Sequence, residues 1–279
     1  MTETAVLEPP PKTASLPDHL SFSSIRLFQN CSRRWAYRYY EQVPEEFKAS
    51  SLLFGSAFHE TVEKIHQCRL ENSKIPTVDD LLTVYDETWT RESQALPIQF
   101  CKDEDEASLR KLAELMLCAF VEYANLEATL PDASQIISIE HKNRHRLLAD
   151  VPPIESRIDL LELQGTNLIV SDLKTSRSRW NDSKVQESLG QLVLYATGLL
   201  PLMHALGAKR IITKFIVVTK AAKNPVVQVL QAQPSNEDDV TRLKQTVAAT
   251  WNAIKKEAFV RSEGWQCAQC PYRRRCLGR

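Results

Sequence analysis

Residues 156–175, SRIDLLELQGTNLIVSDLKT, decide the fold of this chain. The apolar runs at residues 154–163 and 168–175 predict two β-strands, because both are rich in leucine, isoleucine and valine. Gln164-Gly165-Thr166-Asn167 separates them and has the composition of a tight turn. The stretch therefore predicts an antiparallel hairpin.

The register of this hairpin brings two carboxylates together. With a four-residue turn, Leu163 faces Leu168, and Asp159 then lies opposite Asp172. We expect their Cβ atoms to be roughly 5 Å apart, where like charges repel unless a cation lies between them. The hairpin therefore predicts a site for a divalent cation.

Lys174 extends this site, because it follows two residues after Asp172 and strand alternation places it on the same face. Two carboxylates and an amine suit Mg²⁺- or Mn²⁺-dependent hydrolysis of a phosphodiester. The alternative is a surface hairpin whose charged side chains are merely solvated.

The rest of the chain predicts helices before this hairpin and a mixture of helices and strands around it. We expect α/β architecture, a mixed β-sheet flanked by helices, with a mainly helical N-terminal region. The expected helices are 21–28, 54–70, 78–94, 104–130, 183–206 and 238–259, and the further strands begin at 136 and cover 210–219 and 226–230.

Composition excludes several classes of function. Lysine plus arginine balance aspartate plus glutamate at 35 each, so no global positive field is present. The 7 glycines form neither a G-x-G-x-x-G nor a P-loop pattern, which disfavours nucleotide chemistry. The first residues lack a secretory signal and no stretch has the length of a membrane span, so we expect a cytoplasmic protein without a membrane partner.

The motifs resemble the PD-(D/E)XK nuclease superfamily, and specifically its RecB-like branch, which includes CRISPR-associated adaptation nucleases and AddB-type nuclease domains. Four motifs carry the resemblance in the family's order: Gly55-Ser-Ala-Phe-His59, Ser156-Arg-Ile-Asp159, Ser171-Asp-Leu-Lys-Thr175 and Gln191 with Tyr195. The family usually has glycine where Ser156 stands. The resemblance implies a restriction-endonuclease-like core.

The resemblance also implies roles for individual residues. His59, Asp159 and Asp172 would be metal ligands, and Lys174 would be the catalytic lysine. Gln191 and Tyr195 would contact the metal site or DNA from a helix. Glu60 and Glu140 are further acids near these motifs, and no role is assigned to them.

The 7 cysteines predict metal binding, because disulfides are rare in the cytoplasm. Cys267, Cys270 and Cys276 supply three thiolates, one fewer than a tetrahedral site needs. The resemblance selects Cys31 as the fourth ligand and implies a structural [4Fe-4S] cluster, with Zn²⁺ as the alternative occupant. We expect the remaining cysteines, in or beside helices, to be small core residues: Cys68, Cys101 and Cys118.

The chain is expected to divide into a leader and one nuclease domain. Residues 1–18 contain Pro9, Pro10, Pro11 and Pro17 and predict a disordered leader. Residues 19–279 form the domain, with a helical part over 19–131, the catalytic sheet core over 132–232, and a C-terminal helix and cysteine segment over 233–279.

Basic and aromatic residues near these motifs predict contacts with single-stranded DNA. The bases are Arg33, Arg34, Arg38, Arg177, Arg179, Lys184 and residues 273–275, and the aromatic residues are Trp35, Tyr37, Tyr39, Tyr40, Trp180 and Tyr272. We expect a metal-dependent deoxyribonuclease that acts as an exonuclease on single-stranded ends. The alternative is a catalytically silent DNA-binding or scaffold subunit of a repair, phage or CRISPR spacer-acquisition complex, with a four-cysteine zinc or iron-sulfur site. A third possibility is an active nuclease subunit with protein partners in such an assembly.

Overall fold

The computed structural model describes residues 14–232 and 236–278. Most of the predicted leader, residues 1–13, lies outside the described residues. Residues 14–18 form neither helix nor strand, and Leu20 makes an isolated parallel bridge to Ile154. Within the described residues no helix has the length and apolar character needed to cross a membrane.

The centre of the molecule is a five-stranded mixed sheet with the strand order β3-β4-β5-β6-β7. Its strands are β3 (Gln135–His145), β4 (Ile154–Gln164), β5 (Asn167–Ser176), β6 (Arg210–Thr219) and β7 (Val227–Ala232). Neighbours are antiparallel except β5 and β6, which are parallel and are joined by helix α6 (Asp182–Ala205). A parallel pair needs such a crossover, and the predicted mixed α/β fold is confirmed.

The hairpin has the predicted register. Leu163 pairs with Leu168 and Gln164 with Asn167, which leaves Gly165 and Thr166 as the loop. Gly165 has φ of 57°, a left-handed conformation that glycine adopts at little cost. The first strand of the sheet is longer than expected, because β3 continues through polar residues as far as His145.

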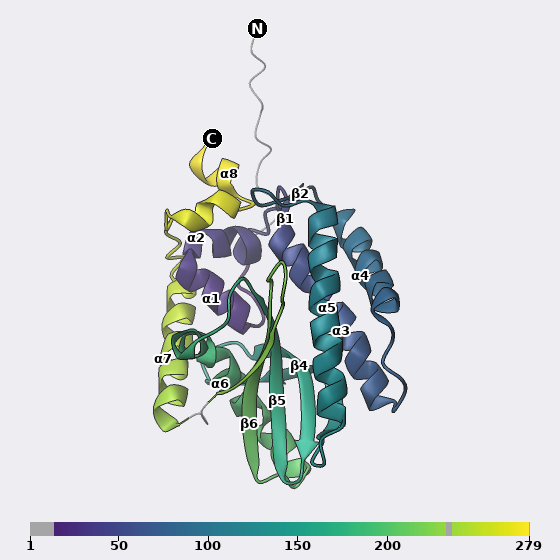
Figure 1. The fold of residues 1–279 in the computed structure, drawn as a ribbon. Coiled ribbons are helices and arrows are strands. Elements are labelled where there is room, and N and C mark those ends of the chain that lie inside the picture. The colour runs from purple at the N-terminus through teal and green to yellow at the C-terminus, as the bar shows by residue number, and fades with distance from the viewer. Residues whose placement is uncertain (1–13, 233–235, 279) are drawn as a thin grey trace.

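Two layers of helices cover the sheet (Figure 1). On one face lie α1 (Phe22–Asn30), α6 and α7 (Glu237–Lys255), and on the other α3 (Ser50–Leu70), α4 (Val78–Ser93) and α5 (Glu106–Ala128). Strand β6 shows the alternation that separates the two cores: Phe215 and Val217 join the first, whereas Ile216 and Val218 join the second. The sheet is therefore buried on both faces.

The two ends of the described chain meet at one end of the molecule (Figure 1). The N-terminal elements there are α2 (Ser32–Trp35) and the π-helical turn η1 (Ala36–Tyr40), and the C-terminal ones are η2 (Trp265–Gln269) and α8 (Arg273–Leu277). The Tyr37 and Tyr272 rings lie 5.4 Å apart, and Arg33 donates its backbone N–H to Val260. Nearby, β1 (Lys48–Ala49) and β2 (Ile98–Gln99) form a short parallel pair.

Candidate active site

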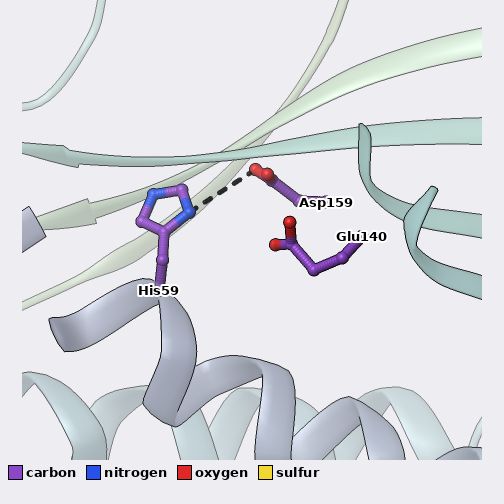
Figure 2. Close-up of side chains that lie close together, drawn as sticks. All are labelled: His59, Glu140 and Asp159. Carbon is purple, nitrogen blue, oxygen red and sulfur yellow. Dashed lines mark ion pairs between the residues drawn. The ribbon is translucent and has the colours of Figure 1, made fainter. Parts of the chain in front are cut away.

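A histidine and two carboxylates come together between α3 and the sheet. His59 is on α3, Glu140 on β3 and Asp159 on β4, and one ligand atom from each lies within 4.8 Å of the other two. His59 Nδ1 is 3.8 Å from Asp159 Oδ2. Figure 2 shows the imidazole pointing from its helix toward both carboxylates. Imidazole and hard carboxylate oxygens form a donor set that suits Mn²⁺ or Mg²⁺.

Asp159 interrupts the β4–β5 ladder. The regular pairing ends at Leu160 and Ser171, and Asp159 Oδ2 instead accepts a hydrogen bond from the Leu173 backbone N–H at 2.6 Å. Burial and repulsion by Asp172 raise the pKa of Asp159 well above its usual value. The predicted closeness of the two carboxylates therefore has an electrostatic consequence that a cation between them would relieve.

Asp172 is held by side chains from α6 and from its own strand. Its carboxylate is buried, and Oδ1 accepts a hydrogen bond from Gln191 Nε2 at 2.7 Å. The Tyr195 hydroxyl lies 3.3 Å from the same oxygen and donates to the Arg157 carbonyl at 3.1 Å. Lys174 Nζ is 2.6 Å from Asp172 Oδ2. All six residues assigned to catalysis and metal binding from the sequence thus lie at one site, although Asp172 is outside the compact group of three.

Burial sets the charge of this site. It lowers the pKa of His59 to about 4, so the imidazole is neutral at pH 7 and one of its two nitrogens is available as a ligand. Burial raises the pKa of Glu140, against the opposing effect of Arg157. Burial, followed by the charge of Asp172, raises the pKa of Tyr195, which stays a neutral hydroxyl.

Glu140 is the site residue to which sequence reasoning assigned no role. Its φ is 51°. In the pairing of β3 with β4, Ile139 pairs with Leu160 and His141 with Ile158, and Glu140 between them has no partner residue. A left-handed residue other than glycine costs of order 1 kcal/mol and is often found at functional sites. Glu140 also forms an ion pair with Arg157. No local sequence signal marks this backbone conformation.

His59, Glu140, Asp159 and Lys174 line a pocket of about 710 Å³ between α3 and the sheet. The pocket is rich in acids, and its charged lining consists of Glu60, Glu63, Glu92, Glu140 and Asp159 with Arg91, Arg157 and Lys174. We call it the acidic pocket. An excess of carboxylates around a concave surface attracts cations.

The cysteines have different environments. Cys31, Cys267, Cys270 and Cys276, from both ends of the described chain, line one small cavity beside α8. Cys68 is buried as predicted. The prediction of a core position is wrong for Cys118, which is exposed on α5, and for Cys101, which is half-buried in a loop where its Sγ accepts a hydrogen bond from Gln269.

The prediction that aromatic residues near the chain ends stack on bases is wrong for three of them. Trp35, Tyr37 and Tyr272 are buried, because they form the packing between the two ends of the chain. Several arginines assigned to DNA pair with acids instead. These pairs are Arg33 with Glu41, Arg38 with Glu45, Arg177 with Glu104 and Arg274 with Glu46.

A mixed sheet that carries clustered carboxylates beside a lysine has the form of a nuclease core, and comparison with known proteins agrees. Residues 19–277 match the PD-(D/E)XK nuclease superfamily, and the chain belongs to that family. Similar folds occur in the crystal structure of a candidate exonuclease from Eubacterium rectale, with 12% identity, a TM-score of 0.54, and coverage of 91% of this chain and 87% of that one.

A more distant structure is that of SSO0001, with 14% identity, a TM-score of 0.33, and coverage of 84% of this chain and 87% of that one. No curated protein matches the sequence. At 12% identity the Eubacterium rectale structure establishes a likeness of fold alone.

Proposed function

We propose that this protein is a divalent-metal-dependent deoxyribonuclease that removes nucleotides from single-stranded DNA ends. The observation that carries the proposal is the convergence of His59, Glu140 and Asp159 within 4.8 Å, beside the Asp172–Lys174 ion pair. Membership of the nuclease superfamily supports phosphodiester hydrolysis. The exonuclease assignment of the Eubacterium rectale protein is consistent with a preference for ends.

The donor set fits a hard divalent cation. Asp159 is half-buried, burial and the charge of Asp172 raise its pKa, and a metal ion offsets such repulsion. His59, Glu140 and Asp159 would hold the ion, with Asp172 as the carboxylate nearest to them on β5. When bound, the cation supplies Lewis-acid polarisation of the scissile phosphate and lowers the pKa of a water molecule.

The chain's own residues orient and neutralise the reacting groups. Lys174 lines the acidic pocket, where its ammonium stabilises the negative charge that develops on a phosphate. Gln191 and Tyr195 fix the Asp172 carboxylate from α6, so its orientation does not depend on solvent. Their role in this proposal is to position Asp172.

The test is digestion of 5′-labelled linear single-stranded, circular single-stranded and duplex DNA with Mn²⁺. We expect progressive shortening of the linear strand only, with no cleavage in EDTA. Equal cleavage of the circle would contradict dependence on ends. Absence of any cleavage, with DNA still bound, would favour the catalytically silent subunit.

We further propose that the cysteine cavity holds a [4Fe-4S] cluster. Cys31, Cys267, Cys270 and Cys276 line one cavity, which supports a shared metal site. Four thiolates suit zinc as well as a cluster. The resemblance to the RecB-like branch favours the cluster.

Anaerobic purification tests the cluster. We expect a brown protein with about four irons and four sulfides per chain. A colourless protein containing one zinc would contradict the cluster and favour the tetrahedral site.

A further inference from the structure

A second cavity adjoins the acidic pocket on the side of α1. It has a volume of about 710 Å³ and lies between the first turns of α1 and the strands β3 and β4, with α6 closing one side. Arg157 and Lys174 line both cavities, so the two meet at the catalytic lysine. We call this second cavity the basic cleft.

The two cavities carry opposite charge. The charged lysine, arginine and carboxylate side chains of the basic cleft are Arg26, Lys142, Arg144, Arg157, Lys174 and Glu155. Five cations thus face a single carboxylate, whereas carboxylates outnumber cations in the acidic pocket. A polyanion is attracted to the cleft, and a metal ion is attracted to the pocket beside it.

Two of these cations are available for a ligand. Arg144 pairs with Glu155, and Arg157 pairs with Glu140. Arg26 and Lys142 are exposed and form no ion pair with any described residue. They line the cleft from different elements, Arg26 from α1 and Lys142 from β3. Phosphates that bind there need not displace an internal partner.

An aromatic ring lies in the same cleft. Phe22, the first residue of α1, is half-buried and packs against α6 at Gly190. A Cβ atom at Gly190 would lie 3.2 Å from Phe22 Cε2, so the missing side chain leaves room for the ring. Rings held in this way beside cations are stacking platforms for unpaired bases.

We propose that the basic cleft binds the single strand of DNA that leads to the scissile phosphate. Arg26 and Lys142 bind its phosphates, and Phe22 stacks on one of its bases. The inference rests on the proposed nuclease function and adds the path of the substrate strand. A cavity of this volume has room for about two nucleotides of a single strand.

The experiment measures binding of a fluorescein-labelled oligo(dT) by anisotropy in EDTA, across a range of salt concentrations. The double variant Arg26→Ala/Lys142→Ala should bind about tenfold more weakly at low salt. Its slope of log K against log salt should be shallower by about 1.4, because each phosphate contact to a single strand contributes about 0.7. Lys111→Ala removes one exposed charge from α5, on the opposite side of the sheet, and should bind as the wild type does.

The ring is tested with a matched pair. Phe22→Leu, which keeps apolar volume without a π-face, should weaken binding at least about fivefold, and Phe22→Tyr should restore it. Thermal melts of both variants establish that α1 remains folded. Equal binding by both variants would remove Phe22 from the proposal.

The outcomes separate this inference from the proposed function, because binding in EDTA needs no hydrolysis. Wild-type salt dependence in the double variant overturns the cleft, whether or not the protein cleaves DNA. A strand that binds through the cleft but is never cut with Mn²⁺ overturns the proposed function alone. Duplex DNA bound as tightly as oligo(dT), with the same loss in the double variant, overturns the restriction to single strands.

Discussion

The active site and the cysteine cavity are built in opposite ways. In the active site the chain itself holds the carboxylates: Leu173 donates to Asp159, and Gln191 donates to Asp172. In the cysteine cavity, the one hydrogen bond that the described thiols donate is a long one, 3.9 Å from Cys267 Sγ to the Ser262 carbonyl. The geometry of the first site therefore depends on the fold, whereas the second depends on what its thiols bind.

This difference predicts that substitutions in the two regions affect different properties. Changes in the active site should lower turnover with little loss of stability. Changes in the cysteine cavity should lower stability, because the proposed cluster would then no longer crosslink the two ends of the chain.

The largest expected effect is that of Cys31→Ser. Loss of this ligand should release the bound iron and lower the free energy of unfolding by about 5 kcal/mol, because a crosslink that closes a very long loop restricts the unfolded chain. Iron content and urea unfolding measure the two effects. Cys118→Ser, at an exposed thiol, is the control and should change neither. Iron retained by Cys31→Ser would show that the ligand assignment is wrong.

Asp172→Asn should lower the rate of Mn²⁺-dependent cleavage by about a thousandfold. The variant removes the charge of the β5 carboxylate from a site where metal chemistry supplies several kcal/mol. Its melting temperature should stay close to that of the wild type, because repulsion of Asp159 is also removed. Asp86→Asn, at an exposed position of α4, controls for the loss of a charge. Wild-type cleavage by Asp172→Asn would exclude this site.

A buried histidine near the site should make folding, rather than catalysis, sensitive to acid. His66 is buried on α3 against Phe120, and burial lowers its pKa to about 3. Because its pKa is depressed in the folded state, His66 contributes stability that is present above pH 6.5 and is lost as the pH falls toward 3.

Urea unfolding in EDTA at pH 7 and pH 5 measures this contribution. The wild type should lose about 2 kcal/mol more than His66→Leu between these values, at about 1.4 kcal/mol for each pH unit below 6.5. An equal loss in both proteins would assign the acid sensitivity to other groups.

Glu140→Gln should give the smallest effect, a change in metal affinity. The Mn²⁺ concentration for half-maximal cleavage should rise at least about tenfold, and saturating Mn²⁺ should restore most of the rate. Glu122→Gln, on the exposed surface of α5, is the matched control. An unchanged Mn²⁺ requirement would remove Glu140 from the metal site.

The sequence predicted the parts of the molecule that depend on local pattern. The pairing of Leu163 with Leu168 followed from the turn around Gly165, and strand alternation correctly placed Lys174 beside Asp172. The division into a leader and one nuclease domain stays a prediction. The roles of the individual site residues stay proposals.

Other features depend on tertiary contacts that local pattern does not encode. The sequence around Trp35 is the same whether its ring stacks on a base or packs inside the protein. The structure buries this ring against the far end of the chain. Cys118 lies on the long helix α5, and the rotation of this helix about its axis decides which side chains face the core. An error of one residue in the expected buried face turns a buried position into an exposed one. The basic cleft joins α1 to β3 and β4 across more than a hundred residues of sequence.

The left-handed backbone at Glu140 implies a conflict between durability and activity. Glycine at this position would relieve the unfavourable φ of 51° and lengthen the lifetime of the folded protein. The same change would delete a carboxylate from the group that includes His59 and Asp159. Selection for heat resistance alone would therefore favour a protein that needs more Mn²⁺, and selection for activity at low Mn²⁺ would favour glutamate at this position.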